Sequence, residues 1–413
     1  MRVRILYVIG NLDVGGAERH LAQVLPRLKM QGFELTIYTI THKGKLATVL
    51  QEAGVEVIEP IFAPILRKLP TLFRKPLLLL SSVPSYCFLM LKLRPSVVHF
   101  FLPEAYLLGG LCSLVLGKRV RIMSRRSLNR YQLKHPFLAK IERRLHSHMN
   151  AVLGNSKAVV KELQEEGVAE DRLGLLYNGI DFSPFDDLPA RSSSRKSLGI
   201  SDDALLMVCV ANLIPYKGHA DLIRALGVIR ADLPGDWAVA MVGRDSGIGE
   251  ELKTLAESQG VTKHILWLGS RSDAVAIYSA AEIGVLCSHE EGFSNSVLEG
   301  MTAGAAMVVT DVGGNAEAVL HGECGLVVPM RNPDALGNAI LTLAKDEEMR
   351  QRLAKAAQRR VREKFSLDTC VSQYASLYKI LLQEPHRCVQ DAIDSAQAVQ
   401  AGDTIKTAVC CIK

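Results

Sequence analysis

Short apolar runs of strand character alternate with longer segments of helical spacing along most of this chain. Val3–Ile9 is such a run, and Ala17–Met30 follows it with apolar residues that repeat at the period of a helix. This alternation predicts a parallel sheet covered by helices on both faces. The runs show little polar alternation, as expected of strands buried on both sides. The other predicted strands are residues 35–40, 55–58, 97–101, 120–123, 151–153, 205–210, 237–242, 264–268, 283–287, 306–310 and 325–328.

The alternation is interrupted by a stretch rich in Pro, Ser and Asp at residues 181–197. Such a composition is typical of a linker between domains. We therefore predict two doubly wound α/β domains, an N-terminal one over 1–185 and a C-terminal one over 186–365. The helical stretch 348–382 is too long and too charged for one core helix, and residues 383–413 are predicted as a partly disordered tail.

Composition excludes several other classes of protein. The chain has 413 residues, of which 48% are hydrophobic and 22% charged, so collagen-like, disordered and disulfide-dense secreted chains are excluded. Its 9 cysteines lack the spacing of a zinc site, and we expect reduced thiols in a cytoplasmic protein. The first apolar run has no cleavage site of small residues and is interpreted as a strand, not as a signal peptide.

Charge is distributed unevenly along the chain. Residues 1–150 hold 23 basic and 8 acidic residues, whereas residues 151–413 hold 26 basic and 35 acidic ones. The basic half predicts an anionic partner, a membrane surface or nucleic acid, and a merely solvated basic face is the alternative. The basic cluster 118–144 has few aromatic residues and no recognition motif, so nucleic acid is not expected.

One basic and apolar segment favours a membrane as the partner. It contains Arg67, Lys68, Arg74 and Lys75, and the stretch that follows, Pro76–Leu91, carries no charge. That stretch is shorter than the ~20 residues needed to span a bilayer. We predict an anchor that lies on anionic head groups at the inner, cytoplasmic face of the membrane. A core helix that leads into the next strand is the alternative.

The most specific motif in the sequence contains two carboxylates. Glu291 lies in the loop after a predicted strand, and Glu299 follows in the first turns of the next helix, with seven residues between them. Ligands bind at that edge of open α/β sheets, and carboxylates accept hydrogen bonds from hydroxyl groups. The pair therefore suits a polyhydroxylated ligand such as a sugar or a ribose. A helix N-cap with ordinary acidic neighbours is the alternative.

Two other strand-to-helix junctions indicate contacts with phosphate. Gly15 and Gly16 precede the first helix, where glycine admits a close ligand and free N–H groups face an anion. Lys217 precedes Gly218 at the start of another helix, where a lysine can sit over a diphosphate. A tight turn and an exposed lysine are the alternatives, and the dinucleotide-binding glycine fingerprint is absent.

Together these motifs resemble the family 4 glycosyltransferases, which have the GT-B fold. The matching segments follow the family's order over residues 1 to about 382, and they are 15–19, 177–181, Lys217-Gly218, Glu291-x7-Glu299 and 311–317. The resemblance implies two facing Rossmann-like domains, a nucleotide-sugar donor bound mainly by the second, and a last helix near 366–382 that returns to the first. It also implies retention of anomeric configuration, with no metal and no cofactor.

The resemblance assigns roles to individual residues. Lys217 would hold the donor diphosphate, Glu299 the ribose hydroxyls and Glu291 the transferred sugar, with Gly15 and Gly16 at the phosphates. A lysine and helix N-termini can stabilise leaving-group charge in place of a metal. The remaining residues of the predicted donor site are Gly292, Phe293, Ser294 and Asn295.

Two positions depart from the family's pattern. Asn212 stands where the family often has Arg, so Arg244 or an arginine of the N-terminal domain is expected to supply the missing charge at the diphosphate. Ser124 stands where the family often has His, so the acceptor-side catalytic residue is predicted as His99, with Glu104 as a weaker candidate. A buried, hydrogen-bonded structural histidine is the alternative for His99.

We therefore expect a hexosyltransferase that uses a UDP-sugar in preference to GDP-mannose. Its acceptor is expected to be lipid-linked or a polysaccharide, in the synthesis of a cell-surface glycan such as lipopolysaccharide. The alternatives are a sugar-nucleotide epimerase or phosphorylase of the same fold and a non-catalytic scaffold.

Overall fold

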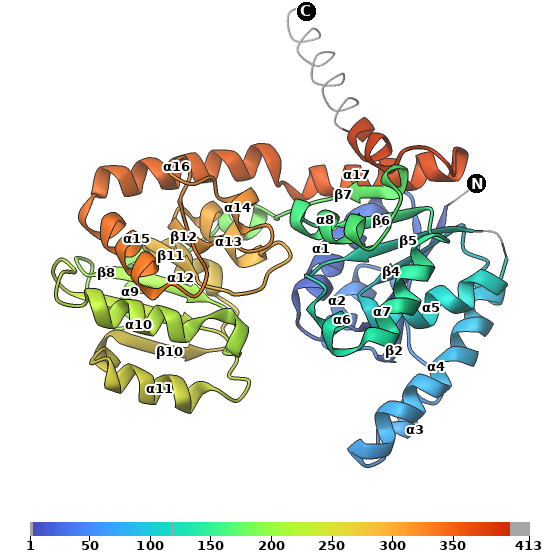
Figure 1. Ribbon diagram of the computed structural model, residues 1–413, viewed down its shortest axis with the longest axis horizontal. Helices are drawn as coiled ribbons and strands as arrows, with labels where there is room; N and C mark the ends of the chain where they lie inside the picture. Colours follow the sequence, from blue (N-terminus) through green and yellow to red (C-terminus); the bar gives the residue numbers. More distant parts are fainter. Residues whose placement is uncertain (1–2, 118, 397–413) are drawn as a thin grey trace, which may run out of the picture. The chain divides into compact units, whose positions relative to one another are not determined.

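A computed structural model describes residues 3–117 and 119–396, without the side chains of residues 71, 72, 74 and 75. The chain forms two compact units (Figure 1). Unit 1 comprises Met1–Gly179 and Leu367–Lys413, and unit 2 comprises Ile180–Ser366. The sequence had placed the first boundary slightly later, after residue 185.

Unit 1 contains a seven-stranded parallel sheet in the order β3-β2-β1-β4-β5-β6-β7. Strand β1 pairs with β2 from Arg4↔Glu34 and with β4 from Ile5↔Val97, so the sheet grows outward from β1 in both directions. The short strand β7 is absent from the sequence prediction, since its three residues include Gly174. The strands are β1 Arg4–Asn11, β2 Glu34–His42, β3 Glu56–Ile58, β4 Val97–Phe101, β5 Val120–Arg125, β6 Ala151–Gly154 and β7 Leu173–Leu175.

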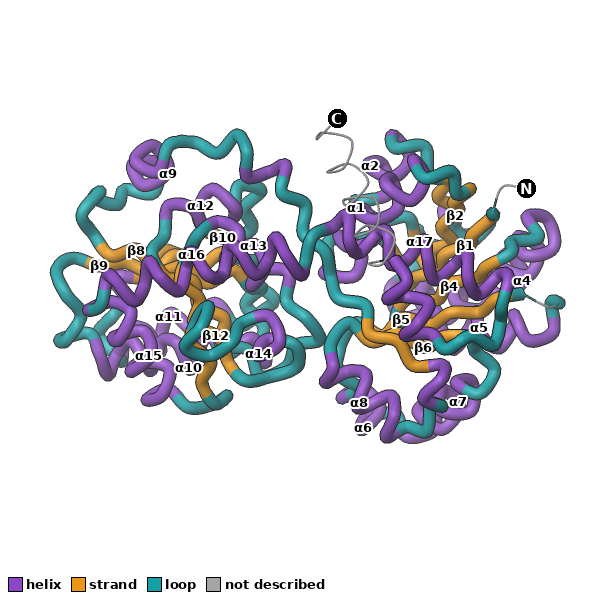
Figure 2. The backbone as a smooth tube through the Cα atoms, turned by 90° about the horizontal axis from the view of Figure 1, so that it is seen from above, coloured by secondary structure: helices purple, strands orange, loops and turns teal. Residues whose placement is uncertain are grey.

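Helices cover both faces of this sheet (Figure 2), and each face buries a separate apolar core. One core joins α1 and α17 to the sheet, and the other lies under α4, α5 and α8. The helices of unit 1 are α1 Gly16–Met30, α2 Ala47–Glu52, α3 Ala63–Leu66, α4 Thr71–Leu93, α5 Pro103–Val115, α6 Arg130–Lys134, α7 Pro136–His146, α8 Lys157–Glu165, η1 Glu170–Arg172 and α17 Leu367–Gln383.

Unit 2 repeats the same winding in a six-stranded parallel sheet, in the order β10-β9-β8-β11-β12-β13. Continuous apolar runs form its strands, as the sequence predicted. They are β8 Leu205–Val210, β9 Trp237–Val242, β10 Ile265–Gly269, β11 Ile283–Leu286, β12 Ala306–Thr310 and β13 Leu326–Val328. Its helices are η2 Ser183–Phe185, α9 Arg191–Ser197, η3 Pro215–Lys217, α10 His219–Ile229, α11 Gly249–Ser258, η4 Thr262–His264, α12 Ala274–Ala280, α13 Asn295–Ala303, α14 Asn315–Ala318, α15 Pro333–Lys345 and α16 Glu347–Lys364. The predicted α/β fold with two Rossmann-like domains is confirmed.

Part of the predicted linker is a helix packed into unit 2. Helix α9 covers residues 191–197, and the Arg195 side chain is fully buried beneath it. Its guanidinium donates hydrogen bonds to the carbonyl oxygens of Ala280, at 2.8 Å, and Ser201, at 3.1 Å. The linker prediction was wrong here because these partners come from later in the chain.

The stretch after residue 383 is ordered further than predicted. Residues 389–396 are helical, and Val389 and Ile393 are fully buried in the core of unit 1. A Cβ on Gly174 of β7 would overlap both side chains, so the missing side chain of Gly174 makes room for this helix. The prediction of a disordered tail is corrected for residues 384–396, and residues 397–413 lie outside the described part of the chain.

Candidate functional site

The predicted donor residues of unit 2 lie at one edge of its sheet, where the parallel strands end. The loops after β8, β9, β11 and β12 all leave the sheet at this edge. The loop after β11, residues 287–294, contains the acidic motif and leads into α13. Topology alone therefore gathers Asn212, Lys217, Arg244 and Glu291 at the edge where open α/β sheets bind ligands.

Lys217 and Glu291 form an ion pair at this edge. The Lys217 Nζ lies 2.5 Å from Glu291 Oε1, and the two side chains are 19% and 10% exposed. The same carboxylate oxygen accepts a hydrogen bond from the Ser288 hydroxyl at 2.7 Å. The pair thus joins two residues that are 74 positions apart in the sequence, and both side chains are partly exposed.

Two glycines allow the acidic loop to lie close to its neighbours. Gly313 has a φ of +53°, and a Cβ there would overlap the carbonyl oxygen of Glu291. Gly218 has a φ of +72°, and a Cβ there would overlap the carbonyl oxygen of Cys287. Both positions therefore require glycine for two reasons, the left-handed backbone and the close approach. The loop is fixed between the Lys217 turn and the loop after β12.

A hydrogen bond between side chains ties the same loop to α10. His289 Nε2 lies 2.7 Å from Asp221 Oδ2, and the His289 N–H donates to the Tyr216 carbonyl oxygen at 2.7 Å. The sequence prediction did not include His289 or Asp221 in the site. An acidic residue in the first turn of α10 is ordinary for a helix start, so the sequence offered no specific signal.

Glu299 lies in the second turn of α13 and is half-buried. Burial raises the pKa of the Tyr278 hydroxyl well above its usual range, and the negative charge of Glu299 raises it further. The Glu299 carboxylate therefore lies near Tyr278 of α12. Its neighbours before the helix are Gly292, Phe293 and Ser294, which are buried, and Asn295, which is half-buried.

The start of α13 presents backbone donors. Ser294 is its N-cap residue, and the Ser294 side chain makes no capping hydrogen bond. The Phe293 ring packs against Phe365 with ring centroids 5.2 Å apart, which anchors the loop just before the helix. An anchored helix N-terminus beside a lysine is a suitable environment for an anionic group.

Asn212 and Arg244 lie next to each other and are joined by a hydrogen bond. The Asn212 side-chain oxygen accepts a hydrogen bond from the Arg244 backbone N–H at 3.1 Å. Both side chains are exposed, so the Arg244 guanidinium extends from the same edge. This placement is compatible with the predicted substitution of Arg244 for the arginine that the family often has at position 212.

The predicted residues of unit 1 also lie where its strands end. Gly15 is the N-cap of α1, and a Cβ there would overlap the Glu18 carboxylate, whereas Gly16 borders open space. Burial raises the pKa of Glu18, and the charge of Asp13 raises it further. Glu104 is exposed in the first turn of α5 and lies beside Gly10.

His99 is completely buried beneath that edge. Its Nδ1 shares a hydrogen bond with the Tyr378 hydroxyl and its Nε2 with the Ser124 hydroxyl, each at 2.8 Å. Burial lowers the pKa of His99 well below its usual range, and the charge of Arg126 lowers it further. Because both ring nitrogens are occupied inside the core, the geometry favours the structural alternative over the predicted catalytic role.

A wider polar network surrounds His99 and was not foreseen from the sequence. Tyr378 bonds to Tyr7 at 2.7 Å, and Tyr374 bonds to His20 at 3.2 Å. Arg126 donates to Tyr374 at 3.4 Å. Both tyrosines of α17 thus reach groups from the first 130 residues, and no local motif signals such long-range pairs.

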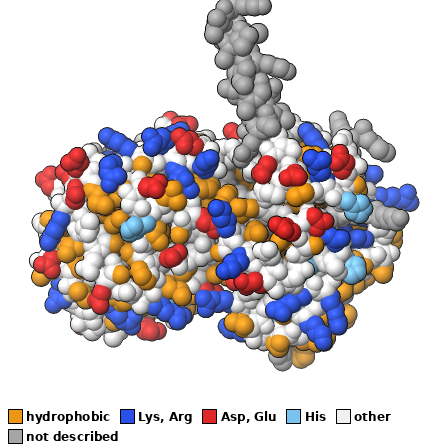
Figure 3. All heavy atoms as spheres, turned by 45° about the horizontal axis from the view of Figure 1, so that its top comes forward, with side chains coloured by type: hydrophobic (Ala, Val, Ile, Leu, Met, Phe, Trp, Pro, Cys, Tyr) orange, Lys and Arg blue, Asp and Glu red, His pale blue; other side chains and the backbone are white. Residues whose placement is uncertain are grey.

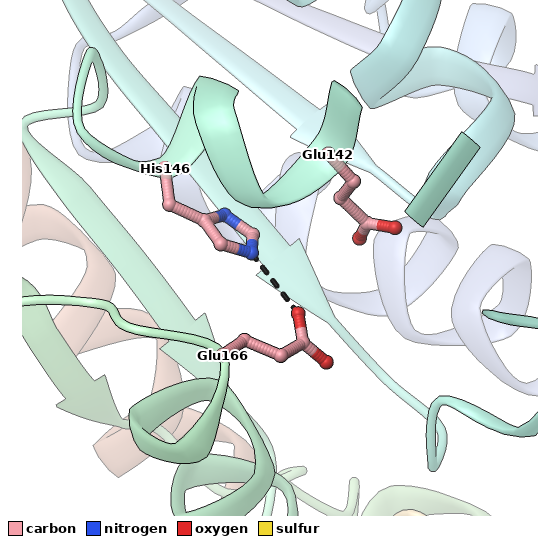
Figure 4. A group of neighbouring side chains, drawn as sticks. All are labelled: Glu142, His146 and Glu166. Carbon is pink, nitrogen blue, oxygen red and sulfur yellow. Dashed lines mark hydrogen bonds and ion pairs between the residues drawn. The ribbon is translucent and has the colours of Figure 1, made fainter. Parts of the chain in front are cut away.

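Glu142, His146 and Glu166 form a group in unit 1 with a spacing that a metal ion could use (Figure 4). Arg125 instead neutralises the carboxylates, donating to Glu142 at 2.6 Å and to Glu166 at 2.5 Å. Burial alone would raise the pKa of Glu166, but the bonds from His146 and Arg125 hold it well below its usual range. The four side chains are at most 3% exposed. A buried ionic network accounts for the group without a metal.

Family models match both halves of the chain. One described as Glycosyltransferase Family 4 matches residues 14–183, and one described as Glycosyl transferases group 1 matches residues 190–360. The D-inositol 3-phosphate glycosyltransferase of Corynebacterium glutamicum is 32% identical over 247 residues, which are 57% of this chain and 59% of that protein. The match thus spans less than two thirds of that relative's length.

Two further similarities extend over most of the chain. A transferase of Campylobacter jejuni named N-acetylgalactosamine-N,N'-diacetylbacillosaminyl-diphospho-undecaprenol 4-alpha-N-acetylgalactosaminyltransferase is 26% identical over 362 residues, 86% of this chain and 93% of that protein. The crystal structure of HepE from Anabaena in complex with UDP has a TM-score of 0.77 at 21% identity, covering 90% of this chain and 98% of that one. The fold and the matched models together place this chain in glycosyltransferase family 4, with the GT-B fold.

Proposed function

We propose that this protein transfers a sugar from a nucleotide-sugar donor to a lipid-linked or polysaccharide acceptor, with retention of anomeric configuration. The observation that carries the proposal is the Lys217–Glu291 pair, partly exposed at the strand-end edge of unit 2 beside the start of α13. Lys217 and Glu291 supply a cation and a carboxylate there, and the start of α13 supplies backbone donors, which suits a diphosphate joined to a polyhydroxylated group.

In this proposal the donor rearranges the pair. The diphosphate draws the Lys217 ammonium away from Glu291, and the freed carboxylate accepts hydrogen bonds from hydroxyls of the sugar. Glu299 accepts from the ribose. As the bond to the sugar breaks, negative charge grows on the leaving diphosphate, and Lys217, the α13 N-terminus and Arg244 stabilise it. No residue in this account requires a metal ion.

Relatives support the choice of substrates. The Anabaena protein was solved with UDP and also with UDP-glucose, so we favour a UDP-sugar as donor over GDP-mannose. The Campylobacter transferase is named for a diphospho-undecaprenol acceptor, which supports a lipid-linked acceptor here and a role in cell-surface glycan synthesis.

The first experiment identifies the donor. The purified chain is screened against nucleotide sugars by thermal shift, since a ligand that binds only the folded state raises the melting temperature. Products are then analysed with and without candidate acceptors. An altered sugar formed from the donor alone would indicate an epimerase, and no heat of binding with any nucleoside diphosphate would indicate a scaffold.

The second experiment tests the site. Replacing a transition-state stabilising charge typically costs about 10²–10³-fold in turnover, so Lys217→Ala and Glu291→Gln should each lose that much transfer. The matched controls are Lys263→Ala and Glu257→Gln, which change exposed residues of unit 2 away from the site. Unchanged transfer in both site variants would refute the assignment.

A further inference from the structure

Helix α4 is predominantly apolar, yet one of its sides is exposed in the described part of the chain. The helix spans Thr71–Leu93 and contains no acidic residue. One side is buried against unit 1 through Ser82, Tyr86, Leu89 and Met90. A surface helix normally turns its apolar side to the core and a polar side to solvent, so the exposed apolar residues of α4 require an explanation.

The exposed side carries a continuous row of large apolar side chains. Leu80 is 71% exposed and Phe88 is 60% exposed. Successive members of the row are three or four residues apart, which keeps the row on one face of the helix. We call this row the α4 stripe, and its members are Phe73, Leu77, Leu80, Pro84, Phe88 and Leu91.

The preceding segment enlarges the apolar surface. Ile61, Phe62 and Ile65, in and just before α3, are each more than half exposed. Figure 1 shows α3 and the first turns of α4 projecting away from the sheet of unit 1. Contiguous exposed apolar surface of this kind marks a site of protein or membrane interaction.

The charge of this segment favours a membrane over a protein as the partner. From residue 60 to residue 103 the sequence has six Lys or Arg and no Asp or Glu. Lys68, Lys92 and Arg94 are exposed, whereas Arg67 is paired with Glu59 at 2.5 Å, and the side chains of Arg74 and Lys75 lie outside the described ones. Figure 3 shows Lys and Arg side chains interspersed with exposed hydrophobic ones on the face of unit 1 that it draws. Apolar rows with basic neighbours match the surface of an anionic bilayer.

The contacts of α4 with unit 1 argue against a membrane-spanning role. By length and composition Pro76–Leu93 is able to cross a membrane, but 33% of it is buried inside unit 1. The Tyr38 hydroxyl of β2 donates to the Ser82 carbonyl oxygen at 2.8 Å and ties the helix to the sheet. A helix held along one side by protein can offer only its other side to lipid.

We propose that the α4 stripe and α3 dock this protein on the surface of an anionic phospholipid bilayer. The stripe enters the interface between head groups and acyl chains, and Lys68 and Lys92 contact the head groups. Docking of this kind brings unit 1 to the surface where a lipid-linked acceptor resides. The inference stands on the exposed surface and not on transferase chemistry, so the two proposals can fail separately.

Co-sedimentation with vesicles, without nucleotide, tests the apolar contribution. The full chain should bind vesicles of phosphatidylcholine mixed with phosphatidylglycerol, and Leu80→Ser with Phe88→Ser should weaken binding by at least about tenfold. The matched control is Met30→Ser with Val228→Ser, which removes two equally exposed apolar side chains from α1 and α10. Equal binding by the stripe variant, or no binding by the wild-type chain, would overturn the proposal.

A second experiment tests how much the basic side chains contribute to vesicle binding. Lys68→Gln with Lys92→Gln should weaken binding to the anionic vesicles by about fivefold or more and leave binding to pure phosphatidylcholine unchanged. Sedimentation velocity of the same variants tests the other occupant. A wild-type dimer that the stripe variant dissociates, with no vesicle binding by either, would make the stripe a contact between two copies and refute membrane docking.

Discussion

The two units wind in the same way, but they differ at the edge where their strands end. In unit 2 this edge presents Lys217 and Glu291, which contact each other and remain partly exposed. In unit 1 the titratable groups beneath the edge, His20 and His99, are fully buried and bonded to tyrosines of α17. A shared topology therefore brings polar groups to the same edge, and whether they can meet a ligand depends on what packs over them.

The largest expected effect comes from the buried ionic network of unit 1. Arg125→Met leaves Glu142 and Glu166 buried without their cation, which should destabilise unit 1 by about 3–5 kcal/mol. Both tryptophans, Trp237 and Trp267, lie in unit 2, so their fluorescence reports on that unit alone. Urea titration should show an earlier loss of circular dichroism with little change in the fluorescence midpoint. Arg144→Met, at an exposed position, is the control, and an equal effect there would contradict the prediction.

In unit 2, a glycine substitution tests how much the close packing of the acidic loop contributes to stability. Gly313→Ala combines an unfavourable left-handed backbone with overlap against the Glu291 carbonyl oxygen, so we expect a loss of about 2 kcal/mol or more. Gly322→Ala has a φ of +75° and open space around it, so it carries only the backbone cost. Tryptophan fluorescence in urea should separate the two variants. Equal midpoints would mean that the close approach at Glu291 contributes nothing.

The stability of unit 1 should depend on pH through its two buried histidines. Burial lowers the pKa of both His20 and His99 in the folded chain, and the charge of Arg126 lowers both further. Below the unfolded pKa of about 6.5 the unfolded chain binds protons that the folded chain excludes, so stability falls as pH falls.

Each histidine should contribute a slope of up to about 1.4 kcal/mol per pH unit below that point. His99→Asn removes one titrating group, so its stability, measured by circular dichroism in urea, should depend less steeply on pH than that of the wild type. An unaltered slope would show that His99 is not held neutral by the fold.

The smallest effect is expected from metal removal. The carboxylates of Glu142 and Glu166 already have Arg125 as their cation, and the proposed chemistry at Lys217 uses side-chain and backbone charge. Transfer measured with the preferred donor should therefore be unchanged by a chelator and by subsequent addition of a divalent cation. Loss on chelation with recovery on addition would require a metal at one of the two edges.

The sequence by itself determined the fold class and the composition of the candidate donor site. Apolar runs such as Leu205–Val210 and Ala306–Thr310 form strands with the predicted ends, because a strand buried on both faces requires an unbroken run. The resemblance of its motifs to the family 4 glycosyltransferases then brought Lys217 and Glu291 into one predicted site.

Only the tertiary structure decided which polar groups are available and which are sealed in the core. His99 and Tyr378 are 279 positions apart, and nothing near either residue encodes their hydrogen bond. The sequence predicts Arg195 to be a linker residue. In the folded chain its guanidinium is buried and donates hydrogen bonds to the carbonyl oxygens of Ala280 and Ser201. The physical reason is that burial and hydrogen-bond satisfaction are properties of the packed chain, whereas strand and helix formation already follow from the local pattern of apolar residues.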